Sequence, residues 1–263
     1  MKTNKAATLC CLLVIGALAA TPCLAQDRKA LSIEQQKQLL SRRLPGNAIA
    51  GTFGSYGSLL FSVLDVAIHT NDQQIGATVL HSPFPEFYKP TIGELLDTIA
   101  SQTQSSWTYD PKTDYWVFAK PAKPKPFSIT LADKWTATDE GVYVGYKPPN
   151  YPVGMDIYYY GTYSADKPEQ EPALATKIRN SWAIGFASNL NPKITPDEMK
   201  GVTVDGVEAL YFEDPAPRPG VVWRQWALVK NRHAFVIVSS LPAHDEQLRS
   251  AVESMVKSFR VTP

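Results

Sequence analysis

The sequence predicts an α+β protein in which a small helix-plus-hairpin unit precedes an antiparallel sheet flanked by helices. Three observations predict this class. A capped amphipathic helix runs directly into a hairpin within residues 90–119. A segment rich in proline and lysine follows at 120–126. The rest of the chain, 127–263, alternates short strands and tight turns with two helices.

The first 25 residues are typical of a secretory signal peptide. Lys2 and Lys5 precede an apolar run over 6–20, and Cys23-Leu24-Ala25 supplies small residues before a cleavage position. We therefore expect an exported protein that is periplasmic or secreted. A lipid anchor on Cys23 is an alternative, which the proline before it disfavours.

All three cysteines, Cys10, Cys11 and Cys23, lie in this leader. Cleavage after Ala25 would leave none, which excludes disulfides, thiol catalysis and thiolate metal sites. The remaining chain carries 24 basic and 25 acidic residues, a net charge of −1. This balance gives no electrostatic basis for binding nucleic acid. No transmembrane segment is expected once the leader is removed.

The N-terminal part begins with a predicted short helix over 31–44, where Ser32 and Gln35 form a capping box. Residues 58–69 predict a strand, because apolar residues alternate there. Three glycines before it lack the spacing of a dinucleotide-binding fingerprint. We expect them to give the chain a flexible entry into that strand.

Residues 90–119 carry the clearest local signal. Thr91 and Glu94 form a second capping box, and an apolar stripe with helical spacing follows. Two aromatic strands, 107–109 and 115–118, then flank a turn-rich loop. The alternating prolines and lysines of 120–126 predict an extended linker. The expected divisions are a signal peptide (1–25), an N-terminal helical segment (26–46), a small α/β unit (47–119), the linker (120–126) and an α+β domain (127–263).

In the second domain, the sequence predicts several strands and two helices. Asp205-Gly206 joins two apolar runs and is a strong hairpin signal. The predicted strands are 142–146, 155–163, 202–204, 207–212, 221–229 and 234–240, and the predicted helices are 169–190 and a segment that starts near Asp245. Strands joined by tight turns and flanked by helices indicate an antiparallel sheet covered by helices.

The order of these features resembles the PsbP-like superfamily, which includes the Mog and DcrB-like proteins. The likeness covers roughly 127–260. It is carried by Phe127-Ser128-Ile129 and Trp135, by 204–209 and 225–229, and by the closing Val256-Lys257-Ser258-Phe259. The resemblance implies an antiparallel sheet between helices and a role in binding or in supporting larger assemblies. It supplies no catalytic residue.

The earlier part, about 60–119, resembles the short N-terminal domain of secretins and TonB-dependent receptors. The helix over 91–104 and the hairpin over 107–118 carry this likeness. It implies pairing with other envelope components, although no barrel follows in this chain.

The sequence predicts no catalytic residue, no metal site and no cofactor. The four histidines, His69, His81, His233 and His244, are scattered and match no zinc motif. Residues 54–57 do not form the nucleophile elbow of a serine hydrolase. An enzyme is therefore disfavoured, without being excluded.

Tyrosine is the one compositional anomaly, since seven of the twelve fall between Tyr143 and Tyr163. Alternation along 155–163 predicts that Tyr159 and Tyr163 share one face, with Ile157, and that Tyr158 and Tyr160 share the other. The candidate ligand-binding surface comprises Tyr146, Tyr151, Tyr158 and Tyr160. The alternative is that tyrosines are simply good strand residues. Trp223 and Trp226 are three apart and are expected on opposite faces.

These observations predict an exported, non-catalytic binding or assembly module of the bacterial cell envelope. The expected partner is an envelope protein, a peptide or a glycan. Two alternatives stay open. One is an envelope hydrolase whose site forms between the two domains, and the other is a purely structural spacer.

Overall fold

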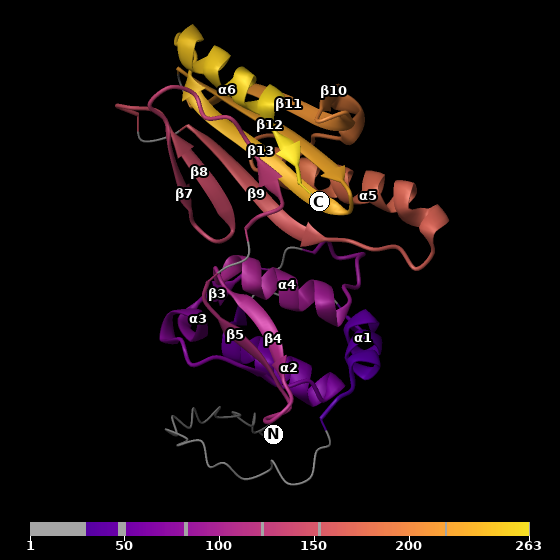
Figure 1. The fold of residues 1–263 in the computed structure, drawn as a ribbon. Coiled ribbons are helices and arrows are strands. Elements are labelled where there is room, and N and C mark those ends of the chain that lie inside the picture. Colours follow the sequence, from indigo (N-terminus) through magenta and orange to yellow (C-terminus); the bar gives the residue numbers. More distant parts are fainter. Residues whose placement is uncertain are drawn as a thin grey trace, which may run out of the picture.

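The computed structural model describes residues 30–46, 51–81, 84–121, 124–151, 154–218 and 220–262. The predicted signal peptide and its three cysteines lie outside the described residues. Figure 1 shows a smaller N-terminal unit that packs against one end of a larger C-terminal sheet. The exact domain borders stay a prediction.

The N-terminal unit surrounds helix α4 (Ile92–Gln102), which the sequence predicted. Its capping box at Thr91 and Glu94 is present, as is the box at Ser32 and Gln35 before α1. The predicted hairpin is also confirmed, since β4 pairs with β5 in antiparallel register. The elements of this unit are α1 (Ile33–Ser41), β1 (Gly51–Thr52), α2 (Phe53–Leu64), β2 (Ile68–His69), α3 (Gln73–Ala77), β3 (Val79–Leu80), α4, β4 (Ser106–Asp110) and β5 (Tyr115–Ala119).

The predicted strand over 58–69 is wrong, because most of this segment belongs to helix α2. The side chain of Thr52 caps the helix by accepting a hydrogen bond from the Ser55 backbone nitrogen. The helix ends at Asp65, which adopts a left-handed conformation with φ of 57°. Only Ile68–His69 forms a strand, parallel to β5.

The side chains of α2 explain the misleading pattern. Phe53, Tyr56 and Leu60 are buried at helical spacing. Three further apolar residues of the helix, Leu59, Phe61 and Val63, flank this buried stripe and are exposed. These residues fill the gaps in the helical pattern, so the segment looks like a continuous apolar run. The glycines expected before a strand lie within and beside this helix.

The C-terminal unit is built on a seven-stranded antiparallel sheet of order β10-β11-β12-β13-β9-β8-β7. This confirms the predicted α+β class, with the large sheet flanked by helices. The hairpin at Asp205-Gly206 is also present. Its elements are β6 (Phe127–Ser128), β7 (Thr136–Asp139), β8 (Tyr143–Lys147), β9 (Met155–Thr162), α5 (Glu171–Ala187), β10 (Lys200–Val204), β11 (Val207–Arg218), β12 (Val221–Lys230), β13 (His233–Pro242), α6 (Glu246–Ser258) and β14 (Arg260–Val261).

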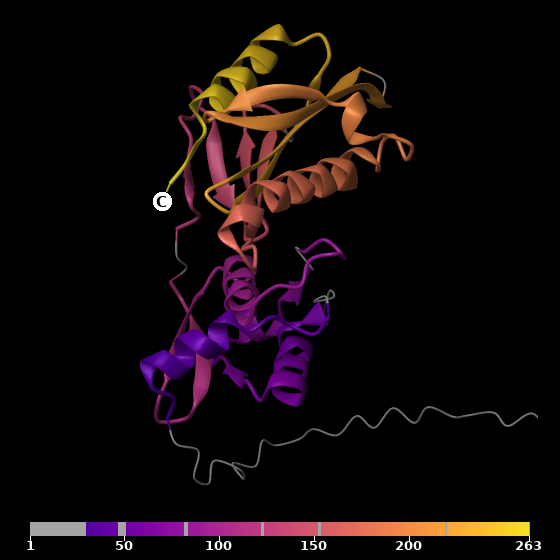
Figure 2. The same cartoon turned by 90° about the vertical axis from the view of Figure 1, so that its right-hand side faces the viewer.

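The two faces of this sheet pack against different elements. Helix α6 covers one face and α5 covers the other (Figure 2). Buried residues form one cluster on the α6 face, around Phe235 and Phe259. A second cluster continues from the α5 face into the N-terminal unit, and joins Ile178 of α5 to Ile99 of α4. As predicted, Trp223 and Trp226 lie on opposite faces.

The alternation predicted for β9 fails at its end. Gly161 has a φ of 81°, and the pairing of β9 with β13 shifts register there. As a result, Tyr163 lies in the same buried cluster as Tyr160, whereas Ile157 and Tyr159 lie on the α6 face. Among the helices of the described residues, none combines the length and apolar character needed to cross a membrane.

Candidate binding site

A cleft opens on the α5 face of the sheet, beyond the area that α5 covers. Its position follows from the register of the strands. One row of paired residues runs across the sheet from Gln225 to Val238, Asp156, Gly145 and finally Thr138. Side chains in such a row point to the same face. Gly145 carries none, so the Asp156 carboxylate and the Tyr143 ring lie over its backbone.

Small residues form much of the floor of this cleft. In the neighbouring row, Ser240 hydrogen-bonds through its backbone nitrogen to the Gly154 carbonyl at 3.2 Å. Gly154 is required by packing, because a Cβ there would lie 2.2 Å from the Tyr146 carbonyl oxygen. At Gly145 a Cβ would approach the Asp156 Oδ1 atom to 3.2 Å. The backbone therefore contributes directly to the shape of the floor.

Aromatic side chains line the cleft and give it an apolar wall. The Tyr143 and Tyr158 rings form a tilted pair with their centroids 5.1 Å apart. Trp223 lies on β12, and Leu190 follows the end of α5. The cleft has a volume of about 580 Å³ and is lined by Thr138, Glu140, Tyr143, Gly145, Lys147, Gly154, Asp156, Tyr158, Leu190, Val221, Trp223, Val238 and Ser240.

Asp156 is the central charged group of the cleft. Within the described part of the chain, its carboxylate has no hydrogen bond and no ion pair. Burial raises the pKa of Asp156, the charge of Lys147 opposes this rise, and the charge of Glu140 adds to it. A half-buried carboxylate without a partner is costly in the free protein, and a suitable ligand would relieve that cost.

Trp223 supplies a second polar group that lacks a partner. Its indole Nε1 atom is buried and makes no hydrogen bond among the described residues. Buried donors are normally satisfied, so this one is an exception within the described chain. The cleft therefore offers an acceptor at Asp156 and aromatic rings at Tyr143, Tyr158 and Trp223.

The predicted tyrosine surface is not brought together as one surface. Tyr158 lines the cleft, whereas Tyr160 is only 9% exposed and stacks on Trp182 with the centroids 3.8 Å apart. Tyr146 is buried in the cluster on the α6 face. Tyr151 is half-buried, and its hydroxyl lies 3.5 Å from the Asp245 carboxylate.

The tyrosine hydroxyls also differ in their surroundings. Burial raises the pKa of Tyr146 and of Tyr158 to about 12, and it raises the pKa of Tyr160 further. All three hydroxyls are therefore neutral at physiological pH. Their role in ligand binding stays a prediction, and only Tyr158 has a ring that lines the cleft.

Asp156, Glu140, Tyr143 and the floor glycines were not predicted from the sequence. One signal was available, since Asp156 is the only charged residue of the otherwise apolar and aromatic strand Met155–Thr162. An acid in such a strand suggests a role that packing alone does not explain. The pairing of Asp156 with Gly145 could not be read from the sequence, because it depends on the register of two strands.

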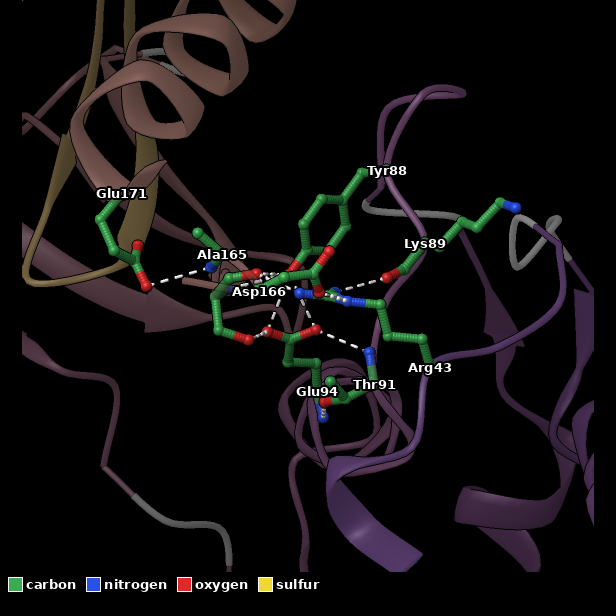
Figure 3. A network of polar contacts seen from close by, with 9 residues as sticks. Arg43, Tyr88, Lys89, Thr91, Glu94, Ala165, Asp166 and Glu171 are labelled. Carbon is green, nitrogen blue, oxygen red and sulfur yellow. Dashed lines mark hydrogen bonds and ion pairs between the residues drawn. The ribbon is translucent and has the colours of Figure 1, made fainter. Parts of the chain in front are cut away.

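A second polar site lies where the two units meet, and Figure 3 shows its contacts. Glu94 at the start of α4 accepts hydrogen bonds from the Tyr88 hydroxyl at 2.8 Å, from Ser164 Oγ at 2.6 Å and from the Thr91 nitrogen at 2.7 Å. Arg43 bonds the Ser164 carbonyl at 2.6 Å and pairs with Asp166 at 2.7 Å. This network joins the two units. Within it, the Glu94 carboxylate receives its hydrogen bonds from the protein itself.

A smaller cavity of about 210 Å³ lies nearby and is lined by residues of both units, including Asp97, Ser101 and His233. The Tyr159 hydroxyl and His233 Nδ1 form a hydrogen bond of 3.0 Å. Burial lowers the pKa of His233, so this ring is neutral at physiological pH. Among the described residues, no group of three or more metal-binding side chains is found.

Comparisons with known proteins leave the family of this chain open. No family model matches it, and no curated protein matches it. A solved structure from Bacteroides thetaiotaomicron is similar over 52% of this chain and 46% of its own length, so the match spans under half of that protein. The identity is 14% and the TM-score is 0.37.

A second solved structure is LpqN, described as involved in cell envelope biogenesis of Mycobacterium tuberculosis. It is similar over 52% of this chain and 83% of its own length, with 16% identity and a TM-score of 0.32. Both scores are low, and no functional argument rests on either likeness. The PsbP-like resemblance stays a prediction.

Proposed function

We propose that this protein is an exported, non-catalytic binding module of the bacterial cell envelope, and that the cleft on the α5 face of the sheet holds its ligand. The observation that carries the proposal is the lining of the cleft. The rings of Tyr143, Tyr158 and Trp223 line the same space as the unpaired Asp156 carboxylate. Export is expected from the leader alone.

The size and lining of the cleft suit a peptide or a glycan fragment. Ligand pockets typically measure about 300–1,000 Å³ and combine apolar walls with a few polar groups. Aromatic rings offer contact area at a low entropic cost. Asp156 and the Trp223 indole would then fix the orientation of the ligand. A spacer would have no need for unpaired polar groups in an aromatic cleft.

Site-specific photo-crosslinking in the native envelope tests this proposal, because it captures a ligand whose identity is still open. A photoreactive amino acid replaces Ser240 on the cleft floor in one variant, and Ser128 in a matched control. Ser128 is exposed on β6 and does not line the cleft. We expect a discrete peptide or glycan adduct from position 240 and none from position 128, as measured by mass spectrometry.

A second variant checks that the adduct depends on the cleft. Ser240→Phe fills the floor, whereas Ser128→Phe adds the same ring elsewhere. Adduct formation from a photoreactive group at Val221, another lining residue, should be lost in the first background and kept in the second. If position 240 gives no adduct, or if both positions give the same adducts, the proposed ligand site is wrong. A result without any adduct would favour the structural spacer.

One observation favours the hydrolase as a second candidate. The cavity at the junction of the two units brings together His233, Asp97 and Ser101. The Ser101 hydroxyl is buried and makes no hydrogen bond among the described residues. A neutral imidazole near a serine and a carboxylate is the chemistry of acyl transfer.

Hydrolysis of a nitrophenyl ester tests this candidate. An esterase would lose its turnover in both His233→Gln and Ser101→Ala, while Ser240→Phe would keep it. A purified protein without turnover, or turnover that survives both substitutions, would exclude the hydrolase at this cavity.

A further inference from the structure

We infer that the cleft recognises an organic ammonium group of its ligand, seated on Asp156 between the rings of Tyr143, Tyr158 and Trp223. The inference rests on the proposed function and narrows the chemistry of the ligand. A lysine side chain of a peptide and an amino sugar of a glycan both supply such a group.

The first step of the argument is the isolation of Asp156. Its carboxylate lies on a central strand, half-buried, and receives no hydrogen bond or ion pair from the described residues. Glu94 shows the contrast, since three neighbouring groups donate to it. A partly desolvated charge without a partner is destabilising until a counter-charge arrives. Asp156 lines the cleft, so a ligand in that space can provide the charge.

The second step is the identity of the walls. The faces of aromatic rings attract cations, most strongly where water is displaced. Tyr143 and Tyr158 lie in adjacent strands beside Asp156, and Trp223 lies on β12. A carboxylate combined with several rings favours an ammonium group over a neutral or anionic one.

The third step is the charge that surrounds Asp156. The charged groups that line the cleft are Glu140, Lys147 and Asp156 itself. From β13, Val238 and Ser240 face the cleft without charge, and Leu190 does so beyond α5. Lys147 is exposed and forms no ion pair with Asp156 within the described chain. The lining is therefore net negative, which favours cations.

Two amine probes and their neutral counterparts test the inference. The amine probes are the peptide acetyl-Ala-Lys-Ala-amide and glucosamine. Their counterparts are the same peptide acetylated on the lysine side chain, and N-acetylglucosamine. Binding to the full chain is followed by the NMR shift of the Trp223 indole group at millimolar probe concentrations. We expect at least one amine to bind about tenfold more tightly than its counterpart, and the one that does identifies the source of the ammonium group.

The substitution Asp156→Asn keeps the shape of the cleft and removes its charge. It should weaken amine binding by about tenfold, whereas Asp197→Asn, at an exposed position outside the cleft lining, should change nothing. Amine binding by the unaltered chain should also strengthen as pH rises through the raised pKa of Asp156, because Asp156 loses its proton while a lysine amine keeps its own.

Two outcomes overturn the inference and are separable from failure of the proposed function. If no amine binds better than its counterpart, or if Asp156→Asn leaves amine binding intact, the ammonium site is wrong. The proposed function survives that result when position 240 still gives a photo-adduct from the native envelope. Both proposals fail when the probes leave Trp223 unchanged and position 240 gives no adduct.

Discussion

The two faces of the seven-stranded sheet are covered to different extents, although the same strands build both. On the α6 face, Trp226 is 6% exposed and lies in the cluster with Phe235 and Phe259. On the α5 face, the helix ends at Ala187, and the cleft lies beyond it. Figure 2 shows α5 and α6 on opposite sides of the sheet.

This difference teaches that coverage by a helix, and not the composition of the strands, decides whether a face forms core or lines a cleft. Aromatic residues occur on both sides of β9 and β12. Tyr160 is covered by α5 and forms core, whereas Tyr158 packs on Phe186 near the end of α5 and also lines the cleft. We therefore expect substitutions on the α6 face to change stability and those in the cleft to change binding.

The largest expected effect on stability comes from substituting the two tryptophans of β12. Trp226→Ala removes a buried ring and should lower the free energy of unfolding by about 3–5 kcal/mol. Trp223→Ala removes a partly exposed ring and should lower it by about 1–2 kcal/mol. Urea denaturation of both variants measures the difference. Equal losses would contradict the proposed asymmetry of the two faces.

Tyr158 and Tyr160, which lie on the same side of β9, allow a similar comparison of core and cleft within the α5 face. Tyr160 stacks on Trp182 under α5, so Tyr160→Ala should cost about 2–4 kcal/mol of stability. Tyr158→Ala should cost less and should weaken ligand capture at the cleft. Thermal unfolding together with photo-crosslinking from position 240 separates the two effects. A Tyr160→Ala variant as stable as the unaltered chain would show that α5 does not seal this position.

The carboxylates of Glu94 and Asp156 provide a third contrast, because only Glu94 has hydrogen-bond partners within the described chain. Glu94 is 6% exposed and accepts several hydrogen bonds, including one from a backbone nitrogen. Glu94→Gln keeps the shape of the side chain but replaces one acceptor oxygen by a donor, so about 1–3 kcal/mol of stability should be lost. Urea denaturation measures this change. An unchanged free energy of unfolding would mean that the network at the junction does not stabilise the fold.

Asp156→Asn should have the smallest effect, and in the opposite direction. Burial raises the pKa of Asp156, so the folded state holds the proton more tightly than the unfolded state does. The stability of the unaltered chain therefore falls as pH rises through that raised pKa. The asparagine variant lacks this dependence and should be the more stable protein at neutral pH.

The same measurement at low pH provides the control. Below the ordinary aspartate pKa of 3.8, both proteins carry a neutral group at position 156, and the difference in stability should vanish. Urea titrations at several pH values test this. A variant that is less stable than the unaltered chain at neutral pH would indicate an internal partner for Asp156.

Local signals in the sequence were sufficient for much of the fold. Capping boxes at Ser32 and Thr91 identified two helices, and the Asp205-Gly206 turn identified a hairpin. The helix α2 was missed because exposed apolar residues flank its buried stripe, so the periodicity that marks a helix is hidden. The helix propensities of these residues would not have changed the prediction. What makes the segment helical is the burial of Phe53, Tyr56 and Leu60, and that burial depends on tertiary contacts.

The candidate site was harder to predict, because strand pairing creates it. Alternation correctly placed Tyr158 and Tyr160 on the side of β9 opposite Ile157 and Tyr159, but no sequence pattern indicated where α5 ends above them. The bulge at Gly161 shifts Tyr163 to the same side as Tyr160. The Asp156 carboxylate lies over Gly145 of another strand, and only the register brings these two residues together.

Fluorine NMR of the two tryptophans of β12 tests the central claim most directly. The full chain is labelled with 5-fluorotryptophan, and the substitutions Trp223→Phe and Trp226→Phe assign the two signals. Soluble peptidoglycan fragments, which contain both glycan and peptide, are then added. We predict that the Trp223 signal moves while the Trp226 signal stays in place. An unmoved Trp223 signal, or equal movement of both, would contradict a ligand site in the cleft.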